Sequence, residues 1–192
     1  MTLTKEYIFT LTCLKEIGIK GVGPKKVLSI GNTIKERNIP IESLEDLASL
    51  MKTMKEKAIN NVRMEDLQKA YNYAMNIVEA SKAEGIGFKG YYDDDFPESL
   101  QKTVDEEGKE NPPLLLWYRG DFSITKLPGI AVIGTREPTE EGIIGGKYLA
   151  GEFAKRGFNI VSGLAVGCDT CGHQGALNVN GKTTAILANG LD

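Results

Sequence analysis

The chain has 192 residues, which is enough for one medium-sized domain or two small ones, and its 41% hydrophobic and 26% charged content is ordinary for a globular protein. No apolar run approaches the roughly 20 residues of a membrane-spanning helix, and the N-terminus has no signal-peptide pattern, so we expect no membrane partner. The net charge of −3 excludes a generally basic surface, and three cysteines, an odd number, favour a reducing cytoplasmic location over a disulfide framework.

Charge is distributed unevenly along the sequence. Residues 1–88 carry 13 basic and 11 acidic side chains, whereas residues 89–127 carry 5 and 9, and residues 128–192 carry 5 and 6. No segment is strongly basic. A site for a polyanion must therefore be local, and must combine a few cations with backbone amides.

The first 85 residues have the pattern of an all-helical unit, and we assign residues 1–88 to a helical domain. Apolar spacing and end signals predict four helices, at 5–16, from Pro24 to Gly31-Asn32, at 43–52 and at 64–84. Ser43 is the expected N-cap of the third helix, and Gly85 is expected to end the fourth.

The segment between the first two helices, residues 19–27, has the order apolar-Gly-apolar-Gly followed by lysines. Gly21, Gly23, Lys25 and Lys26 fit the hairpin of a helix-hairpin-helix module, in which exposed amides and nearby lysines hold one DNA phosphate. The alternative is a helix-joining turn that uses glycine for a positive φ. A third interpretation makes the whole helical unit a protein-docking module.

Residues 89–127 read as a connecting segment, because acidic residues and prolines become frequent there. A short helix is expected near 98–104 and a strand at 114–118. Tyr91, Tyr92 and Trp117 have side chains that could stack on bases, but packing within the protein is the favoured interpretation.

From Gly129 onward, short β-branched runs alternate with helical patterns. Strands are expected at 129–134, 158–162 and 183–188, with helices at about 140–156 and 169–178. This alternation predicts right-handed βαβ units and a parallel sheet, hence an α/β fold over residues 128–192. The side chains that we expect the first of these helices to bury are Ile143, Gly146, Leu149, Ala150 and Phe153.

The first two of these strands end in glycine and small hydroxyl residues just before a helix. The candidate phosphate-binding residues are Gly134, Thr135 and Arg136 after the first strand, and Ser162, Gly163 and Gly167 after the second. Loops at the carboxyl ends of adjacent parallel strands outline one anion-binding crevice, because glycine admits a ligand and the next helix points its amides at negative charge. Arg136 is expected to clamp a phosphate. The alternative is a strand-to-helix turn with a surface arginine.

Two cysteines and the only histidine follow in Cys168-Asp169-Thr170-Cys171-Gly172-His173. This pattern raises zinc binding or redox chemistry, but no fourth metal ligand is evident, and cysteines at a buried helix start usually pack as small apolar residues. Asp169 and His173 are expected to cap the helix and order its loop in preference to forming an acid–base pair. We therefore expect no metal and no cofactor.

With these loops and the hairpin in place, the chain resembles the DprA (Smf) family of DNA-processing proteins over roughly residues 5–192. That family carries a Gly-Ser-Arg turn and a Ser-Gly-x-Ala-x-Gly-x-Asp loop. The matching segments are Gly134-Thr135-Arg136, Ser162 to Asp169, His173 to Leu177, Gly181-Lys182-Thr183 and Asn189 to Asp192. Thr135 replaces the usual serine, and Cys168 and Cys171 stand at positions that are usually apolar or small.

The resemblance implies a Rossmann-like domain, of which residues 128–192 are the first half, preceded by a helix-hairpin-helix or SAM-like domain. It implies single-stranded DNA binding and loading of the RecA recombinase in natural transformation or recombination, with Arg136 in the DNA site. It also implies a homodimer in the full-length form and no covalent chemistry.

The alternative function is a nucleotide-binding or nucleoside-phosphate-hydrolysing enzyme of a related Rossmann-like superfamily. Such relatives have a Gly-Gly-x-Gly-Thr loop followed by glutamate, and Gly145-Gly146 does not provide it because Lys147-Tyr148 follows and the pair lies in a predicted helix. The third strand, around Ala185-Ile186-Leu187, would leave a sheet edge open. We therefore expect a fragment of a larger domain, or an edge closed by another chain or by the N-terminal unit.

Overall fold

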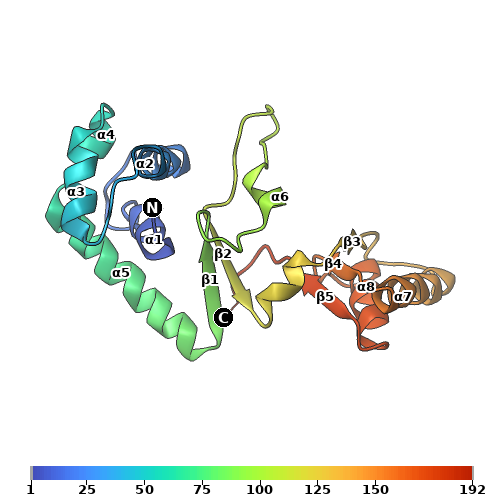
Figure 1. Cartoon of the computed structure of the whole chain (residues 1–192). Helices are drawn as coiled ribbons and strands as arrows, with labels where there is room; N and C mark the ends of the chain where they lie inside the picture. The colour runs from blue at the N-terminus through green and yellow to red at the C-terminus, as the bar shows by residue number, and fades with distance from the viewer. Residues whose placement is uncertain (1, 192) are drawn as a thin grey trace. The chain divides into compact units, whose positions relative to one another are not determined.

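The computed structural model describes residues 2–191, and its contacts divide the chain into two compact units (Figure 1). We call residues 1–119 the N-terminal unit and residues 120–192 the C-terminal unit. The boundary predicted at residue 88 lies inside a strand, and the one at residue 127 lies just before another. The division of the sequence into residues 1–88, 89–127 and 128–192 therefore stays a prediction. No helix of the described residues is long and apolar enough to cross a membrane.

The N-terminal unit begins with five helices, as its apolar spacing indicated. They are α1 (Lys5–Cys13), α2 (Pro24–Arg37), α3 (Leu44–Thr53), α4 (Lys57–Asn60) and α5 (Met64–Ala83). Ser43 caps α3 by accepting a hydrogen bond from the amide of Asp46, whose carboxylate returns to the Ser43 amide. Gly85 follows α5 with a φ of +72°, as expected for a helix end. The four-residue α4 is a helix that the sequence pattern did not predict.

The predicted end of α2 at Gly31 is wrong. The helix continues to Arg37 and ends where Asn38 adopts a φ of 50°. Gly31 is instead a point of close approach, since a Cβ at that position would lie 2.2 Å from the ring of Tyr92. The Tyr92 hydroxyl donates to the carbonyl of Leu28 at 3.1 Å or to Asn32 Oδ1 at 2.9 Å, and its burial raises the pKa of this phenol. Glycine there serves packing, because it admits the ring.

Two strands complete the N-terminal unit, with α6 (Glu98–Gln101) between them. β1 (Ile86–Gly90) pairs antiparallel with β2 (Leu115–Arg119), with Phe88 opposite Trp117. The strand at β2 was predicted, but β1 was not. Trp117 stacks on Phe88 at 5.0 Å and meets Phe9 edge-on at 5.2 Å, which confirms packing within the protein as a use of this side chain.

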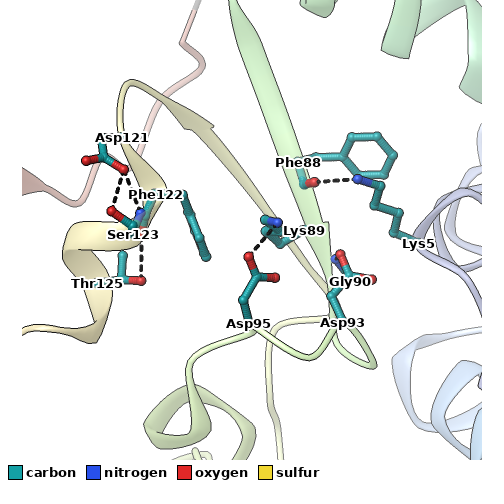
Figure 2. Close-up of polar contacts among 10 residues, drawn as sticks. All are labelled: Lys5, Phe88, Lys89, Gly90, Asp93, Asp95, Asp121, Phe122, Ser123 and Thr125. Atoms are coloured by element: carbon teal, nitrogen blue, oxygen red, sulfur yellow. Dashed lines mark hydrogen bonds and ion pairs between the residues drawn. The ribbon is translucent and has the colours of Figure 1, made fainter.

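Polar contacts tie β1 to its surroundings in the N-terminal unit (Figure 2). Lys5 of α1 donates to the carbonyl of Phe88 at 3.4 Å, and its ammonium lies 4.9 Å from the centre of the Phe88 ring. Lys89 pairs with Asp95 at 2.7 Å, and the hydrogen bond raises the pKa of this lysine. The strand pair and the helices share one hydrophobic core, in which Leu114, just before β2, belongs to the same cluster as Ile8, Leu11 and Leu67.

The C-terminal unit contains the expected parallel sheet. Its elements are η1 (Phe122–Lys126), β3 (Gly129–Ala131), α7 (Glu140–Lys155), β4 (Asn159–Ser162), α8 (Cys168–Leu177) and β5 (Lys182–Ala185). η1 starts at Asp121, whose carboxylate accepts hydrogen bonds from the Ser123 amide and hydroxyl (Figure 2). The strand order is β3-β4-β5 with parallel pairing on both sides of β4. Among the described residues, β3 and β5 are therefore both edge strands.

Both long helices of this unit pack on the same face of the sheet, because Ile160 of β4 contacts a cluster that includes Ala150 and Ala154 of α7 and Ala176 of α8. Figure 1 shows α7 and α8 beside one another. The core is small. The expectation that α7 buries Leu149 and Phe153 is wrong, since these side chains are 57% and 37% exposed. Small residues (Ala150, Gly151 and Ala154) form its buried face instead, because α7 and α8 approach each other closely.

Candidate nucleic-acid interface

Two loops at the carboxyl ends of β3 and β4 meet in the C-terminal unit. We call residues 133–137 the arginine turn and residues 163–167 the glycine loop. The amide of Cys168, the first residue of α8, donates to the carbonyl of Thr135 at 3.1 Å. The Cys168 side chain lies against Gly134, where a Cβ would be 2.7 Å from the sulfur. The structure therefore brings the two predicted loops together, as neighbouring parallel strands require.

Gly167 makes the closest approach between the loops. It has a φ of +88°, and a Cβ on it would lie 2.4 Å from the Thr135 carbonyl oxygen and 2.7 Å from the Arg136 backbone. Any other residue would be strained by its backbone angle and would clash with the arginine turn. The glycine predicted to admit a ligand thus admits the neighbouring loop.

Asp169 organises the glycine loop from inside. Its buried carboxylate accepts hydrogen bonds from the amides of Gly163 at 3.1 Å and Ala165 at 3.3 Å. These two amides flank Leu164, which adopts a φ of 64° that is uncommon for a leucine. The expectation that Asp169 orders the loop is confirmed, whereas the expectation that Asp169 and His173 cap α8 is wrong, because the N-cap Gly167 has no side-chain capping bond. The amide of Gly163 is consequently already bonded to a carboxylate, and a phosphate would have to displace that group.

Ser162 and His173 are bonded inside the unit. The buried Ser162 hydroxyl donates to the carbonyl of Val132 at 2.6 Å, so its proton is not directed at a ligand. The Thr183 hydroxyl donates to the Ile160 carbonyl at 2.8 Å and lies 2.6 Å from Nδ1 of His173. Nδ1 of His173 therefore has a hydrogen-bond partner in Thr183, whereas its buried Nε2 has none among the described residues. Burial lowers the pKa of this imidazole.

Arg136 is the candidate residue that the structure leaves most available. Its side chain is exposed and has no ion pair or hydrogen bond among the described residues. Thr135 fixes the turn around it, because its side-chain oxygen accepts from the amide of Glu137 at 3.1 Å. By contrast, Arg156 at the opposite end of α7 is paired with Glu152 at 3.0 Å.

Exposed apolar side chains occur in the same two loops as this cation. Ile133, Leu164 and Val166 are 77%, 57% and 68% exposed. Exposed side chains of this kind can contact the faces of unstacked bases, while an arginine beside them contacts the phosphates. Sequence reasoning missed Leu164, because its positive φ arises from the bonds that Asp169 makes to both neighbours.

The predicted hairpin residues lie in a loop at residues 20–23 and in the first turn of α2, and we call residues 20–25 together the hairpin loop. Val22 is buried and anchors it, and Gly21 has a φ of +92°. Lys26 Nζ donates to the Gly21 carbonyl at 2.6 Å, so this lysine closes the loop. The amides of Gly21, Gly23 and Lys25 have no hydrogen-bond partner in the described part of the chain, as a phosphate site of this type requires.

An acidic turn at residues 105–109 faces the hairpin loop. Lys25 lines a cavity of about 440 Å³ together with Asp105, Glu106, Glu107 and Lys109. Lys109 is itself paired with Glu107. The carboxylates reduce the positive potential at Lys25, which makes this end of the hairpin loop less attractive to a polyanion.

Nothing in the described residues forms a metal site. No group of three or more His, Cys, Asp or Glu side chains that could hold an ion is found there. The three cysteines are free thiols, and Cys13, buried in the N-terminal unit, has a pKa that burial raises to about 11. Asp192, the last residue of the motif that starts at Asn189, lies outside the described residues.

Comparison with known proteins places this geometry among DNA-processing proteins. The sequence model of the family described as DNA recombination-mediator protein A matches residues 88–192. The chain is 38% identical over 104 residues to Protein Smf of Synechocystis, covering 52% of this chain and 25% of that protein. It is also 38% identical over 101 residues to the DNA processing protein DprA of Streptococcus pneumoniae, covering 52% and 33%.

The solved structure of DNA processing protein A from Streptococcus pneumoniae matches this fold with a TM-score of 0.63 and 25% sequence identity. The alignment covers all of this chain and 60% of that one. The DNA processing protein DprA of Bacillus subtilis is 28% identical over 127 residues, which is 66% of this chain and 41% of that protein. By sequence, the chain thus spans between a quarter and about two fifths of the length of these relatives, and by structure it spans 60% of the solved chain.

Proposed function

Because the chain belongs to the family of DNA recombination-mediator protein A, we propose that it binds single-stranded DNA and takes part in loading the RecA recombinase onto that DNA. The family match and the relatives named DNA processing proteins support a role in DNA processing. Binding to single-stranded DNA, the RecA partner and a homodimer for the full-length form are the parts that we propose.

The observation that carries the proposal is the state of Arg136. It is an exposed, unpaired cation among the described residues, on a turn fixed by Thr135 and by the close approach of Gly167. A guanidinium on such a turn can bind two phosphate oxygens at once, because none of its donors is already engaged. Ile133 and Leu164 offer apolar contacts for bases without reading their edges, so binding is expected to be independent of sequence.

The contribution of the other predicted site residues is narrower than the sequence suggested. Gly134 and Gly167 set the loop geometry, and Thr135 holds the turn. Gly163 and Ser162 act inside the protein through their bonds to Asp169 and Val132. We propose that the DNA contact in this unit is made mainly by Arg136 and the exposed apolar side chains beside it.

The hairpin loop is proposed as a second contact, through its unbonded amides and Lys25. This proposal is separable from the first, because each loop lies in its own unit. If neither joint replacement of Lys20 and Lys25 by alanine nor Gly23→Pro, which removes one of the unbonded amides, lowers the affinity, the hairpin loop is only a helix-joining turn. A protein-docking role for the N-terminal unit would then be the better interpretation.

We propose no enzymatic reaction for this chain. Hydrolysis of an N-glycosidic bond needs an acidic group poised at the sugar, and the buried Asp169 carboxylate is held by the amides of the glycine loop. His173 is likewise buried and directed at Thr183. Release of free base from nucleoside monophosphates, followed by chromatography, would contradict this part of the proposal.

The test is fluorescence anisotropy with a labelled oligo-dT strand at several salt concentrations. We expect the logarithm of the association constant to fall linearly with the logarithm of the salt concentration, because phosphate contacts release counterions. Arg136→Ala should weaken binding about tenfold or more, as expected for loss of a charge-assisted contact. Arg156→Ala is the matched control, since it removes the same charge from the far end of α7.

RecA loading is tested separately, by following RecA filament growth on the same strand with and without this chain. An accelerated onset that Arg136→Ala abolishes would support coupling between DNA binding and loading. Acceleration that persists in Arg136→Ala would separate the two activities and exclude this residue from loading.

A further inference from the structure

Cys168 and Cys171 occupy the first turn of α8, at its first and fourth positions. Their Cys-x-x-Cys spacing places both side chains on one face of the helix, since residues three apart are neighbours on a helix surface. Both are free thiols, and Cys168 is partly exposed whereas Cys171 is buried. The function proposed above uses neither thiol.

The surroundings of the two cysteines differ. Cys171 lies against α7, where a Cβ on Gly146 would be 3.3 Å from its own Cβ. Cys168 touches the arginine turn twice, through its sulfur at Gly134 and through its amide at the Thr135 carbonyl. Only Cys168 is therefore free to change its position without disturbing the packing between the helices.

We propose that Cys168 and Cys171 are a redox-active dithiol, which closes to an intramolecular disulfide and so loosens the arginine turn. Side chains three apart on a helix have Cβ atoms about 5–6 Å apart, and a disulfide needs about 3.5–4.5 Å. Closure therefore draws Cys168 toward the fixed Cys171. The first turn of α8 can tighten, because its N-cap Gly167 makes no side-chain capping bond.

The reaction is thiol–disulfide exchange with a small disulfide such as oxidised glutathione. The partly exposed Cys168 loses its thiol proton, and its thiolate attacks one glutathione sulfur, forming a mixed disulfide and releasing one glutathione thiolate. Cys171 then loses its proton and attacks the Cys168 sulfur, which forms the protein disulfide and releases the second glutathione thiolate. The two protein thiols lose two electrons and two protons, and one glutathione disulfide becomes two thiols.

The consequence concerns the DNA site and rests on the function proposed above. When the Cys168 sulfur moves toward Cys171 it leaves Gly134, and the bond from the Cys168 amide to Thr135 weakens. The turn that presents Arg136 then loses its contact with α8. Oxidation should therefore weaken single-stranded DNA binding, and reduction should restore it.

The dithiol is tested without DNA. The reduced chain is equilibrated over a range of glutathione redox ratios, alkylated, and analysed by intact mass and peptide mapping. We expect a fraction that has lost two hydrogens, with Cys168 linked to Cys171 and Cys13 alkylated as a buried internal control. Cys171→Ser should instead accumulate glutathione on Cys168, and Cys168→Ser should form no disulfide.

The coupling is tested by hydrogen exchange at the Cys168 amide and by anisotropy with oligo-dT. Oxidation should speed exchange at this amide and weaken binding about tenfold, reversibly, while Cys168→Ser, which can form neither the disulfide nor the adduct at this position, should be insensitive to the oxidant. Stable glutathione on Cys168 of the unmodified chain, with no transfer to Cys171, would overturn the dithiol. A disulfide that leaves both amide exchange and affinity unchanged would overturn the coupling. Failure of the reduced chain to bind DNA would count against the proposed function, while the exchange result would still decide the inference.

Discussion

The hairpin loop at residues 20–25 and the glycine loop at residues 163–167 both lead into a helix whose N-cap is a glycine without a side-chain capping bond, Gly23 for α2 and Gly167 for α8. They differ in what the loop contacts. Gly23 has an extended backbone and open space where a Cβ would be, whereas Gly167 has a positive φ and is enclosed by the arginine turn. The amides of the hairpin loop are unbonded among the described residues, whereas Asp169 occupies two amides of the glycine loop.

In the function that we propose, the same sequence signal therefore supports two kinds of anion site. In the hairpin loop, the backbone itself remains available for a phosphate. In the C-terminal unit, the carboxylate of Asp169 occupies two loop amides, so we propose that an exposed side chain, Arg136, makes the contact instead. The hydrophobic cores of the two units also differ in the size of their buried side chains. The N-terminal unit buries many large apolar side chains, whereas the C-terminal unit buries chiefly alanines and Ile160.

The largest expected effect is that of Gly167→Ala. The added Cβ would lie 2.4 Å from the Thr135 carbonyl on a residue of positive φ, and together the strain and the clash should cost about 4 kcal/mol. Urea unfolding followed by circular dichroism measures this cost. Trp117, the only tryptophan, lies in the N-terminal unit, so its fluorescence reports on that unit and should change little.

Gly23→Ala is the matched substitution in the hairpin loop. We expect a change in unfolding free energy of no more than about 1 kcal/mol, because the added methyl group meets nothing within 4 Å. Equal losses of stability in the two variants would remove the structural distinction between the loops.

The next largest effect is expected for Asp169→Ala. It leaves the amides of Gly163 and Ala165 without their acceptor and releases Leu164 from its positive φ, at a cost of about 2–3 kcal/mol. Hydrogen exchange at these two amides should accelerate, which can be measured by NMR. Protection that remains unchanged would mean that the carboxylate does not order the loop. Asp121→Ala, which removes an exposed carboxylate that also accepts backbone bonds, is the control.

Comparing Arg136→Ala with Lys25→Ala sharpens the functional distinction. We expect Arg136→Ala to cost about 1.5–3 kcal/mol of binding free energy to oligo-dT, and Lys25→Ala less than about 1 kcal/mol, because the acidic turn faces Lys25 and amides supply the hairpin contact. Anisotropy titrations at one fixed salt concentration measure both values. A larger loss for Lys25→Ala would make the hairpin loop the main DNA contact.

The smallest expected effect is on the pH dependence of stability. Burial lowers the pKa of His173 from its usual 6.5, so the unfolded chain binds this proton more tightly than the folded chain does. With respect to this group, the unfolding free energy of the C-terminal unit is thus highest above about pH 6.5 and falls as the pH decreases below that value. Carboxylates titrate mainly below about pH 4.5, so His173, the only histidine, dominates between pH 7.5 and 5.5.

His173→Gln removes this titration, and its urea midpoint should be less dependent on pH over that interval than the midpoint of the unsubstituted chain. The expected signal is a difference between two slopes, measured by circular dichroism. Parallel slopes would show that His173 remains as easily protonated in the folded chain as in the unfolded one.

The sequence by itself determined the order of helices and strands except for α4, β1 and η1, the parallel arrangement of residues 129–185 and the meeting of two loops at the ends of β3 and β4. Apolar spacing, capping residues such as Ser43 and strand–helix alternation are local signals, so they can be read without knowing which residues meet in space. The presence of an arginine in one of these loops was visible in the same way.

Only the tertiary structure decided which polar groups are already bonded and which side chains are buried. Gly163 and Ser162 are residue types typical of a phosphate site, yet they hydrogen-bond to Asp169 and to the Val132 carbonyl because of how the loops pack. Gly31 lies inside α2, where the ring of Tyr92, far away in sequence, packs against it. Leu149 is exposed because small residues form the face of α7 that packs on α8. A hydrogen bond or a packing contact depends on distances between segments, and sequence periodicity specifies the segments without specifying those distances.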